Sequence, residues 1–294
     1  MNREYGGQSM VDPIRKVVVR RPDAAFGSAD PERWHYTDRP DLRVAQEEHD
    51  ALVEILRGKG AEVVYHDTLL PELADAIFVH DAAIVTDAGA VILRMGKELR
   101  RGEEAAIANC FDRMGIPIHA RLEGDALAEG GDLLWIDDHT LAAGLGFRTN
   151  VEGLKQLAAA LEDVGAGVTP VPLPYGDGPD ACLHLMSLIS MLDHDLAVVY
   201  LPLLPVPFVE LLQDRGIRLV EVPEAEFPSM GPNVLALAPR KCLALEGNPV
   251  TRERLEAADC EVLTYKGDEL SLKAEGGPTC LTRPCLLYTS DAAD

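Results

Sequence analysis

Hydrophobic and polar positions along the chain repeat one local pattern five times. In each copy, apolar residues recur every three or four positions, as they do on one face of an α-helix. A turn and a short run rich in β-branched residues come next, which is typical of a strand. The five helix-and-strand segments cover residues 41–66, 101–120, 150–173, 206–223 and 249–265.

Each predicted helix ends at a residue that tolerates a left-handed backbone. Four end at glycines (Gly60, Gly115, Gly165 and Gly216), and the fifth ends at Asp259. Glycine adopts this conformation without a steric penalty, and aspartate visits it more readily than most residues do. The helix ends are 55, 50, 51 and 43 residues apart, so the pattern has a period near fifty.

Pairs of short apolar runs lie between the helices and predict β-hairpins. They occupy residues 82–94, 133–144, 196–202 with a neighbouring run, and 233–245, and each breaks at a polar or proline-containing turn. Each repeat is therefore a ββαβ unit. Five such units cannot each bury a core of their own, so we predict an α/β fold in which they close into a ring. An ordinary open α/β sheet, which would show a similar alternation, is the alternative.

The two ends of the chain lack the repeat. We expect one domain over residues 13–286 and a flexible leader over residues 1–12, with Met10 as an alternative start. The final segment, LLYTSDAAD, resembles translated sequencing-adapter read-through, so residues 287–294 are expected to be a non-native tail. The sequence contains neither a signal-peptide core nor an apolar run long enough to span a membrane.

Composition narrows the function further. The 294 residues are 47% apolar, which excludes an intrinsically disordered chain, and their formal net charge is −22. This acidity argues against partners such as nucleic acid or an anionic membrane, and favours a cationic one. The six cysteines are scattered without metal-ligand spacing, and no glycine-rich phosphate loop is present. We therefore expect a cytoplasmic protein without a metal or organic cofactor.

Polar residues interrupt the apolar pattern at four places, each at a strand end or in a loop. They are Asp75 with Asp81, Glu129 with Asp132, His184, and Cys280. Taken singly, each has a structural explanation, such as a turn, a buried histidine or an inert core thiol. Taken together in a closed ring, they bring a thiol, an imidazole and carboxylates to one centre. That set matches a flat cation with an electrophilic carbon, such as a guanidinium group.

Five spaced motifs resemble the guanidino-group-modifying superfamily, which includes dimethylarginine dimethylaminohydrolases, arginine deiminases and amidinotransferases. The motifs are FVHDAAIV, EGGD, RTN, LHLMS and PTCLT, with Arg94 following the first. The resemblance runs from about Lys16 to Pro284 and is greatest to the dimethylarginine dimethylaminohydrolases. It implies a five-bladed α/β propeller (pentein) of ββαβ units, in agreement with the repeats. It also implies a cofactor-free cysteine hydrolase that converts N-methylated arginine into citrulline and an amine.

The resemblance implies three catalytic residues. Cys280 matches the nucleophile, and His184 matches the general acid and base that protonates the leaving amine and then activates water. Glu129 matches a carboxylate that grips the guanidinium and orients the histidine.

The remaining residues match substrate-binding positions. Asp81 matches a second guanidinium-binding carboxylate, and Asp75 matches a contact near the α-amino group. Arg94 and Arg148 match the arginines that hold the substrate's α-carboxylate, with a structural ion pair as the alternative for each. Asp132 is expected either to contact the site or to brace its loop by hydrogen bonds.

Two departures from the family pattern leave alternatives open. His80 stands where dimethylarginine dimethylaminohydrolases have a glutamate, and Met186 stands where arginine deiminases have an aspartate. Deiminase and amidinotransferase chemistry use the same core residues, and a propeller without catalysis could serve as a binding module. We expect a small cationic or zwitterionic guanidino substrate and no nucleic-acid or membrane partner, and the sequence leaves a homo-oligomer open.

Overall fold

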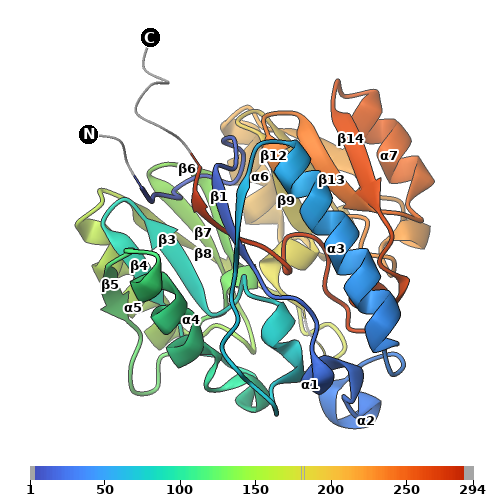
Figure 1. Ribbon diagram of the computed structural model, residues 1–294. Helices are drawn as coiled ribbons and strands as arrows, with labels where there is room; N and C mark the ends of the chain where they lie inside the picture. Colours follow the sequence, from blue (N-terminus) through green and yellow to red (C-terminus); the bar gives the residue numbers. More distant parts are fainter. Residues whose placement is uncertain (1–3, 180, 182, 288–294) are drawn as a thin grey trace.

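The computed structural model describes residues 4–179, 181 and 183–287, and the strands within these residues form five three-stranded sheets (Figure 1). Following the chain, the first four sheets consist of β3 (Ala83–Thr86), β4 (Gly89–Ile92) and β5 (Ile118–Arg121); β6 (Leu133–Asp137), β7 (Thr140–Leu145) and β8 (Gly167–Pro172); β9 (Ile189–Asp193), β10 (Leu196–Val199) and β11 (Arg218–Glu221); and β12 (Leu235–Ala238), β13 (Lys241–Leu245) and β14 (Glu261–Tyr265). The fifth sheet consists of β15 (Arg283–Leu286), β1 (Lys16–Val19) and β2 (Glu62–Tyr65).

All five sheets have the same internal order. The first strand pairs antiparallel with the middle strand, and the middle strand pairs parallel with the last one. A helix makes each parallel crossover; these helices are α3 (Leu42–Gly58), α4 (Glu103–Arg113), α5 (Val151–Glu162), α6 (Val206–Asp214) and α7 (Pro249–Glu256). Two short helices, α1 (Ala24–Gly27) and α2 (Pro31–Trp34), precede α3. The predicted ββαβ repeat is confirmed.

The residues predicted to end the helices adopt the left-handed backbone. Gly60, Gly115, Gly165 and Gly216 have φ between 68° and 92°, and Asp259 has φ of 65°. An L-residue larger than glycine is strained there, so the glycines allow a tight turn into the following strand. These local signals explain why the helix positions were readable from the sequence.

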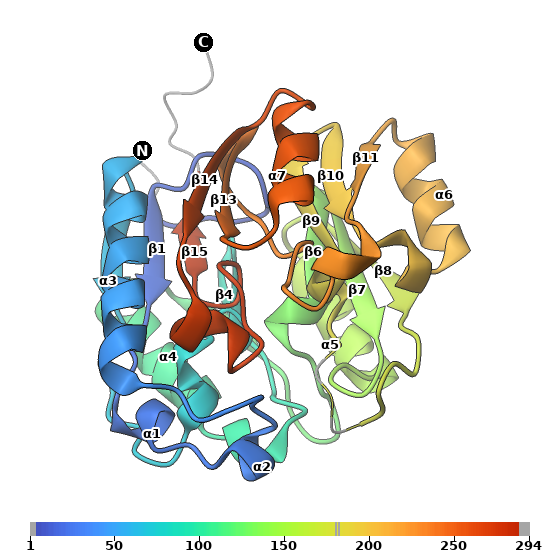
Figure 2. The same ribbon diagram turned by 90° about the vertical axis from the view of Figure 1, so that its right-hand side faces the viewer.

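The ring closes through the two ends of the chain. β15 pairs antiparallel with β1, with Val17 opposite Pro284 and Val18 opposite Arg283. Figure 2 shows β15 beside β1, and shows α3 and α6 at opposite sides of the molecule with the sheets between them. This arrangement is the predicted five-bladed α/β propeller.

Neighbouring sheets share hydrophobic clusters, and strands such as β1 and β3 contribute alternate residues to two of them. Val17 and Val19 pack towards β12–β14, whereas Val18 packs towards β3 and β4. Ile84 packs towards β6 and β7, whereas Val85 packs with Val18. Successive side chains of a strand point to opposite faces, so both faces of these sheets are buried.

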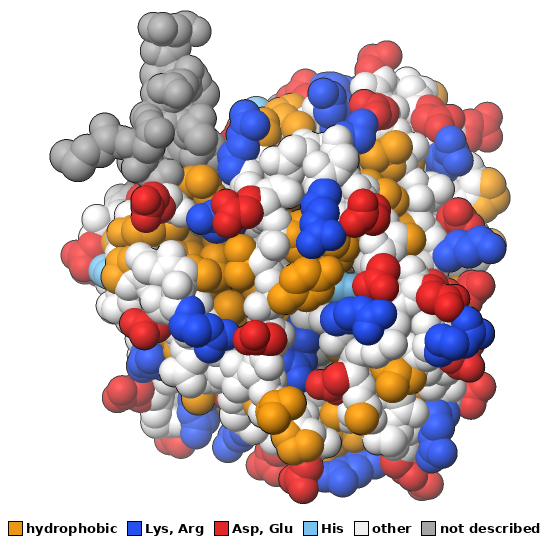
Figure 3. Space-filling model, in the orientation of Figure 1, with side chains coloured by type: hydrophobic (Ala, Val, Ile, Leu, Met, Phe, Trp, Pro, Cys, Tyr) orange, Lys and Arg blue, Asp and Glu red, His pale blue; other side chains and the backbone are white. Residues whose placement is uncertain are grey.

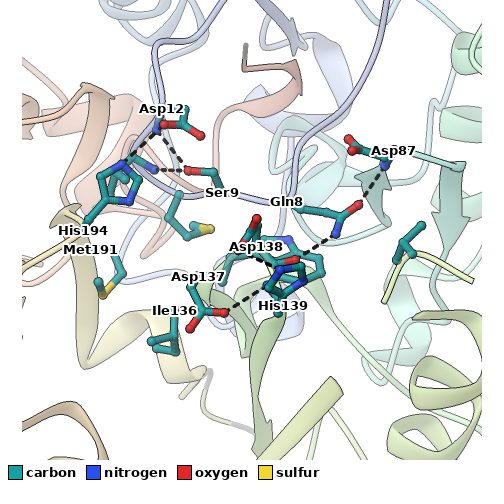
Figure 4. A pocket seen from close by; sticks show the side chains of 14 residues that line it. Gln8, Ser9, Asp12, Asp87, Ile136, Asp137, Asp138, His139, Met191 and His194 are labelled. Atoms are coloured by element: carbon teal, nitrogen blue, oxygen red, sulfur yellow. Dashed lines mark hydrogen bonds and ion pairs between the residues drawn. The ribbon is translucent and has the colours of Figure 1, made fainter. Parts of the chain in front are cut away.

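The segment before residue 13, expected as a flexible leader, is packed against the ring where it is described. The backbone N–H of Gly6 donates to Cys285 O at 2.9 Å, and Leu287 N–H donates to Gly6 O at 3.1 Å. Gln8 is buried and joins two hairpin turns, because its side chain accepts from Asp87 N–H and donates to Asp138 O (Figure 4). These contacts put Gly6 to Val11 into the folded body. Residues 288–294 of the expected tail lie outside the described residues.

The surface carries mixed charge. On the face in Figure 3, Lys and Arg side chains lie singly among acidic ones and form no continuous basic patch. None of the helices in the described part of the chain has the length and apolar content that a bilayer crossing requires.

We predict that Leu52→Ala destabilises the fold by about 2–5 kcal/mol, because it leaves a cavity under α3. Leu52 is 0% exposed in the cluster between α3 and the fifth sheet. Leu69→Ala is the matched control, since Leu69 is 88% exposed, and should change stability by less than about 0.5 kcal/mol. Urea unfolding of both variants measures the difference. Equal stabilities would contradict the packing described above.

Candidate active site

Polar side chains precede the first strand of every sheet. They are Asp81 before β3, Glu129 and Asp132 before β6, His184 before β9, Asn233 before β12 and Cys280 before β15. A cavity of about 450 Å³ brings four of them together, namely Asp81, His184, Asn233 and Cys280. The repeat therefore delivers groups from four sequence-distant loops to one place.

His184 is oriented by the carboxylate of Glu129. Nε2 of the imidazole lies 2.8 Å from Oε2 of Glu129. The other oxygen, Oε1, accepts hydrogen bonds of 2.9 Å from the backbone N–H groups of Gly96 and Lys97, and Arg148 Nη1 lies 3.6 Å from it. Glu129 is fully buried and is not among the residues that line the cavity. Its contact with the cavity is therefore made through His184.

These partners keep Glu129 ionised. Burial by itself would raise the pKa of this carboxyl group, but the hydrogen bond and charge of His184 and the charge of Arg148 lower the pKa to about 2. A buried carboxylate is stable as an anion only with such compensation. The anion in turn holds the imidazole in one orientation, as proton transfer to a bound ligand requires.

Asp81 supplies an anion to the cavity itself. Arg100 Nη1 donates to Oδ2 at 2.6 Å, and the backbone N–H of Gly131 donates to Oδ1 at 2.8 Å. Burial would raise the pKa of Asp81, but the charges of Arg100 and His184 lower it well below its ordinary value. Each oxygen of a carboxylate can accept two hydrogen bonds, so this geometry leaves capacity for a cationic ligand.

The two glycines of the EGGD motif allow these groups to approach closely. A Cβ atom on Gly131 would lie 2.4 Å from His184 Nδ1, and one on Gly130 would lie 2.1 Å from the carbonyl oxygen of His80. Both distances are far below van der Waals contact, so neither position has room for a side chain. The motif is therefore a requirement of packing around His184.

Arg94 does not line the cavity, contrary to the sequence prediction. Its backbone forms an antiparallel bridge with Ala128 in the wall between two sheets. The chain then turns at Gly96, where a Cβ atom would lie 2.8 Å from Arg148 Cα. Lys97 and Arg100, which follow this turn, line the cavity instead, and Arg148 lines it too.

Arg100 is a residue that the sequence analysis missed. Its Nε and Nη2 atoms donate to Glu103 at 3.0 and 2.8 Å, and Nη1 is the donor to Asp81. Burial raises the pKa of Glu103 to about 7 despite the charge of Arg100. The guanidinium is thus engaged by two acids of the protein. In the charged run GKELRRGEE it looks like a solvated surface residue, so no local signal marked it.

Asp75 lines the cavity and is already paired. Lys97 Nζ donates to its Oδ2 at 2.6 Å, and the hydroxyl of Tyr36 donates to its Oδ1 at 2.7 Å. The Lys97 ammonium also donates to Trp34 O at 2.9 Å and lies 5.1 Å from the centre of the indole ring. Lys97, which the sequence analysis also missed, adds a cation where only Asp75 was expected.

Asp132 braces the loop that carries His184. It is fully buried, accepts from Thr149 Oγ1 at 2.7 Å and from Leu185 N–H at 3.0 Å, and does not line the cavity. Burial raises the pKa of its carboxyl group to about 6. Of the two roles considered for this residue, these contacts favour the brace.

Cys280 differs from the other described cysteines in its exposure. It is partly exposed and lines the cavity, whereas Cys110, Cys242, Cys260 and Cys285 are buried. Cys182 lies outside the described residues. Exposure within a polar cavity is the setting in which a thiol reacts.

His80, the residue that departs from the family pattern, has its side chain outside the cavity at Cys280. Its Nδ1 lies 2.9 Å from Thr282 O, and the residue lines a separate, smaller cavity beside Arg283. Burial lowers the pKa of this imidazole to about 3, so it is neutral at physiological pH. His80 is not among the residues that line the main cavity.

A second large cavity, of about 520 Å³, is lined by residues of the turns that join the first and middle strands of three sheets, among them Asp87, His139 and His194 (Figure 4). Two of its acids lie beside histidines. Oδ1 of Asp12 is 3.6 Å from Nε2 of His194, and Oδ1 of Asp138 is 3.6 Å from Nε2 of His139. No cysteine is among its described lining residues. It therefore lacks a thiol like that of Cys280.

Comparisons with known proteins give a consistent result. A family model described as "N,N dimethylarginine dimethylhydrolase, eukaryotic" matches residues 35–287. The chain is 33% identical over 273 residues to the N(G),N(G)-dimethylarginine dimethylaminohydrolase of Streptomyces coelicolor, an alignment that covers 92% of this chain and 96% of that protein.

Solved structures are also similar. A dimethylarginine dimethylaminohydrolase from Pseudomonas aeruginosa, complexed with citrulline, has a TM-score of 0.76 at 26% identity over 92% of this chain and 99% of that one. The amidinotransferase SxtG of Microseira wollei has a TM-score of 0.79 at 15% identity over 98% of both chains, which shows a shared fold.

We predict that Glu129→Gln flattens the loss of stability in acid. The pKa of Glu129 in the folded state, about 2, lies below the ordinary value of 4.5. The stabilisation from its charge is therefore present above pH 4.5 and is lost as the pH falls towards 2. Between pH 5 and pH 3 the wild type should lose about 2 kcal/mol through this group.

Urea unfolding at pH 5 and pH 3 measures the effect, and the glutamine variant should lose about 2 kcal/mol less than the wild type. Glu62→Gln is the control, because Glu62 is exposed on β2, and should follow the wild-type pH dependence. Parallel pH curves for wild type and Glu129→Gln would refute the account of this carboxylate.

Proposed function

The chain belongs to the N,N-dimethylarginine dimethylhydrolase family, and from this membership and the geometry of the cavity we propose that it hydrolyses N-methylated arginine to citrulline and a methylated amine. The observation that carries the proposal is that Cys280, His184 and the ionised Asp81 line one cavity. A thiol can attack the guanidinium carbon, an imidazole can move the protons, and a carboxylate can hold the cation.

The first half of the reaction forms a covalent intermediate. The Cys280 thiolate attacks the central guanidinium carbon, and a C–S bond forms. His184 gives its proton to the methylated nitrogen, the C–N bond breaks, and the amine leaves. A thiouronium group on Cys280 remains.

The second half regenerates the enzyme. A water molecule attacks the same carbon, and the neutral His184 accepts a proton from it. The C–S bond then breaks, which returns the thiolate and gives the ureido group of citrulline, and the second proton passes through solvent to the released amine. Glu129 holds His184 in the same orientation for both proton transfers, through the 2.8 Å contact to Nε2.

Two cations of the cavity are suited to the substrate's α-carboxylate. Arg148 and Lys97 both line it, Arg148 beside Glu129 and Lys97 paired with Asp75, whereas Arg100 is held between two acids, Asp81 and Glu103. Lys97 thus takes the role that the family resemblance implied for Arg94. A carboxylate beside Lys97 would share its ammonium with Asp75, which lies 2.6 Å away.

We predict that Cys280→Ser lowers kcat/KM for dimethylarginine by at least about 10³-fold, because a serine hydroxyl in this setting is a far weaker nucleophile. Citrulline formation measures the rate. Cys110→Ala is the matched control, since this thiol is buried on α4 away from the cavity, and should retain activity.

Near wild-type turnover by Cys280→Ser would refute the assignment of the nucleophile. A wild-type protein that binds methylated arginine without releasing citrulline or amine would instead identify a non-catalytic binding module. Formation of a new guanidino product only when an amine is added would identify an amidinotransferase.

We also predict that the enzyme prefers its carboxylated substrate, methylated arginine, to agmatine by about thirtyfold or more in kcat/KM, because agmatine lacks the carboxylate that Arg148 and Lys97 bind. Methylated arginine, arginine and agmatine are compared under identical conditions. Lys97→Met should reduce the preference, mainly through KM for the carboxylated substrates.

Arg94→Met separates the sequence interpretation from the structural one. Because Arg94 is absent from the cavity lining, this variant should keep the wild-type preference. Loss of the preference in Arg94→Met but not in Lys97→Met would restore the original assignment.

A further inference from the structure

Four of the five sheets place a residue with a proposed catalytic or substrate-binding role ahead of their first strand, and the β12–β14 sheet places Asn233 at the same position. Asn233 stands two residues before β12, as Asp81 stands two residues before β3. Asn233 is 6% exposed and lines the cavity with Cys280 and His184. The resemblance to a known family assigned it no role.

The Asn233 amide contacts the loop of the nucleophile with both of its ends. Oδ1 accepts from the backbone N–H of Thr279 at 3.1 Å and from Thr279 Oγ1 at 2.8 Å. Nδ2 lies 3.5 Å from Cys280 Sγ, within hydrogen-bond distance for a sulfur acceptor. One side chain therefore holds the loop backbone and the thiol together.

These contacts determine which way the amide faces. The backbone N–H of Thr279 can only donate, so the atom 3.1 Å from it must be the amide oxygen. The NH₂ end of Asn233 is consequently the end that faces Cys280. Sulfur therefore receives an N–H donor, which favours the thiolate over the thiol.

The loop before Cys280 packs closely against Asn233 and Phe78. A Cβ atom on Gly277 would lie 2.5 Å from Oδ1 and Cγ of Asn233, and a Cβ on Gly276 would lie 2.0 Å from the ring of Phe78. Because Gly276 and Gly277 have no side chains, the loop that carries Cys280 can approach Asn233 this closely. The amide and this loop are therefore in direct contact.

We propose that Asn233 is a positioning residue that donates a hydrogen bond to the Cys280 thiolate, and so keeps the nucleophile ionised and aimed at the guanidinium carbon. This inference rests on the proposed function, in which Cys280 is the nucleophile. It adds a donor for sulfur to a site whose proposed residues are otherwise a histidine, carboxylates and cations.

The experiment measures the ionisation of Cys280 without using a substrate. Iodoacetamide alkylation of Cys280 is followed from pH 5 to pH 10 by mass spectrometry, and thiolate absorbance near 240 nm is followed as the difference from Cys280→Ser. Asn233→Ala should raise the apparent pKa of alkylation by about one unit, so that the rate well below the pKa falls about tenfold. Asn233→Asp, which keeps the shape but places a carboxylate at the sulfur, should raise it further.

Asn248→Ala is the matched control. Asn248 is also 6% exposed and hydrogen-bonded, but its partners are Ser229 and Leu245 rather than the Cys280 loop. This variant should leave the apparent pKa of Cys280 unchanged. Circular dichroism checks that each variant is folded, and Asn233→Asp provides the test if Asn233→Ala does not fold.

An unchanged alkylation profile in a folded Asn233→Ala or Asn233→Asp would overturn the inference. That result is distinct from failure of the proposed function, in which the wild type would show the same thiolate titration but form no citrulline from methylated arginine.

Discussion

The constraint on which this structure depends is that each sheet has two apolar faces. The alternation of Val17, Val18 and Val19 between two hydrophobic clusters shows it in the fifth sheet. A sheet of this kind needs a neighbour on both sides, because an uncovered face would expose a large apolar area to water. An open row of five would leave one such face at each end. Pairing β15 with β1 builds the fifth sheet from both ends of the chain. This sheet packs against both the first and the fourth, so no apolar face is left uncovered at the ends of the row.

Closing the ring also decides where charges can be buried. The loops before the first strands meet in one cavity, so several carboxylates and cations come together away from bulk water. Each must be compensated locally, since an unpaired buried charge is costly. Arg100 compensates Asp81 and Glu103, Arg148 and His184 compensate Glu129, and Lys97 compensates Asp75. The proposed catalytic groups and the groups that hold them are therefore one connected network.

Parts of this network were readable in the sequence and parts were not. Cys280 and His184 stood out because each interrupts an apolar or glycine-rich segment, and both line the cavity. Arg94 was assigned through the resemblance to a known family, whereas Arg100 belongs to none of the motifs and sits in a run of charged residues that resembles a solvated helix start. No local pattern marked Asn233, because a single asparagine that follows a proline and precedes a strand is typical of a turn.

The sequence by itself determined the local order of the molecule. Apolar positions that recur every two residues specify the strands, and those that recur every three to four residues specify the helices. Residues that tolerate a left-handed backbone end the helices. All these signals act between neighbours along the chain. Only the tertiary structure decided that β1 pairs with β15, that Glu129 lies behind His184, and that Arg100 faces Asp81 while Arg94 does not. Those contacts join residues that are far apart along the chain or separated by a turn. Their geometry follows from how the sheets pack around the ring, which no local pattern encodes.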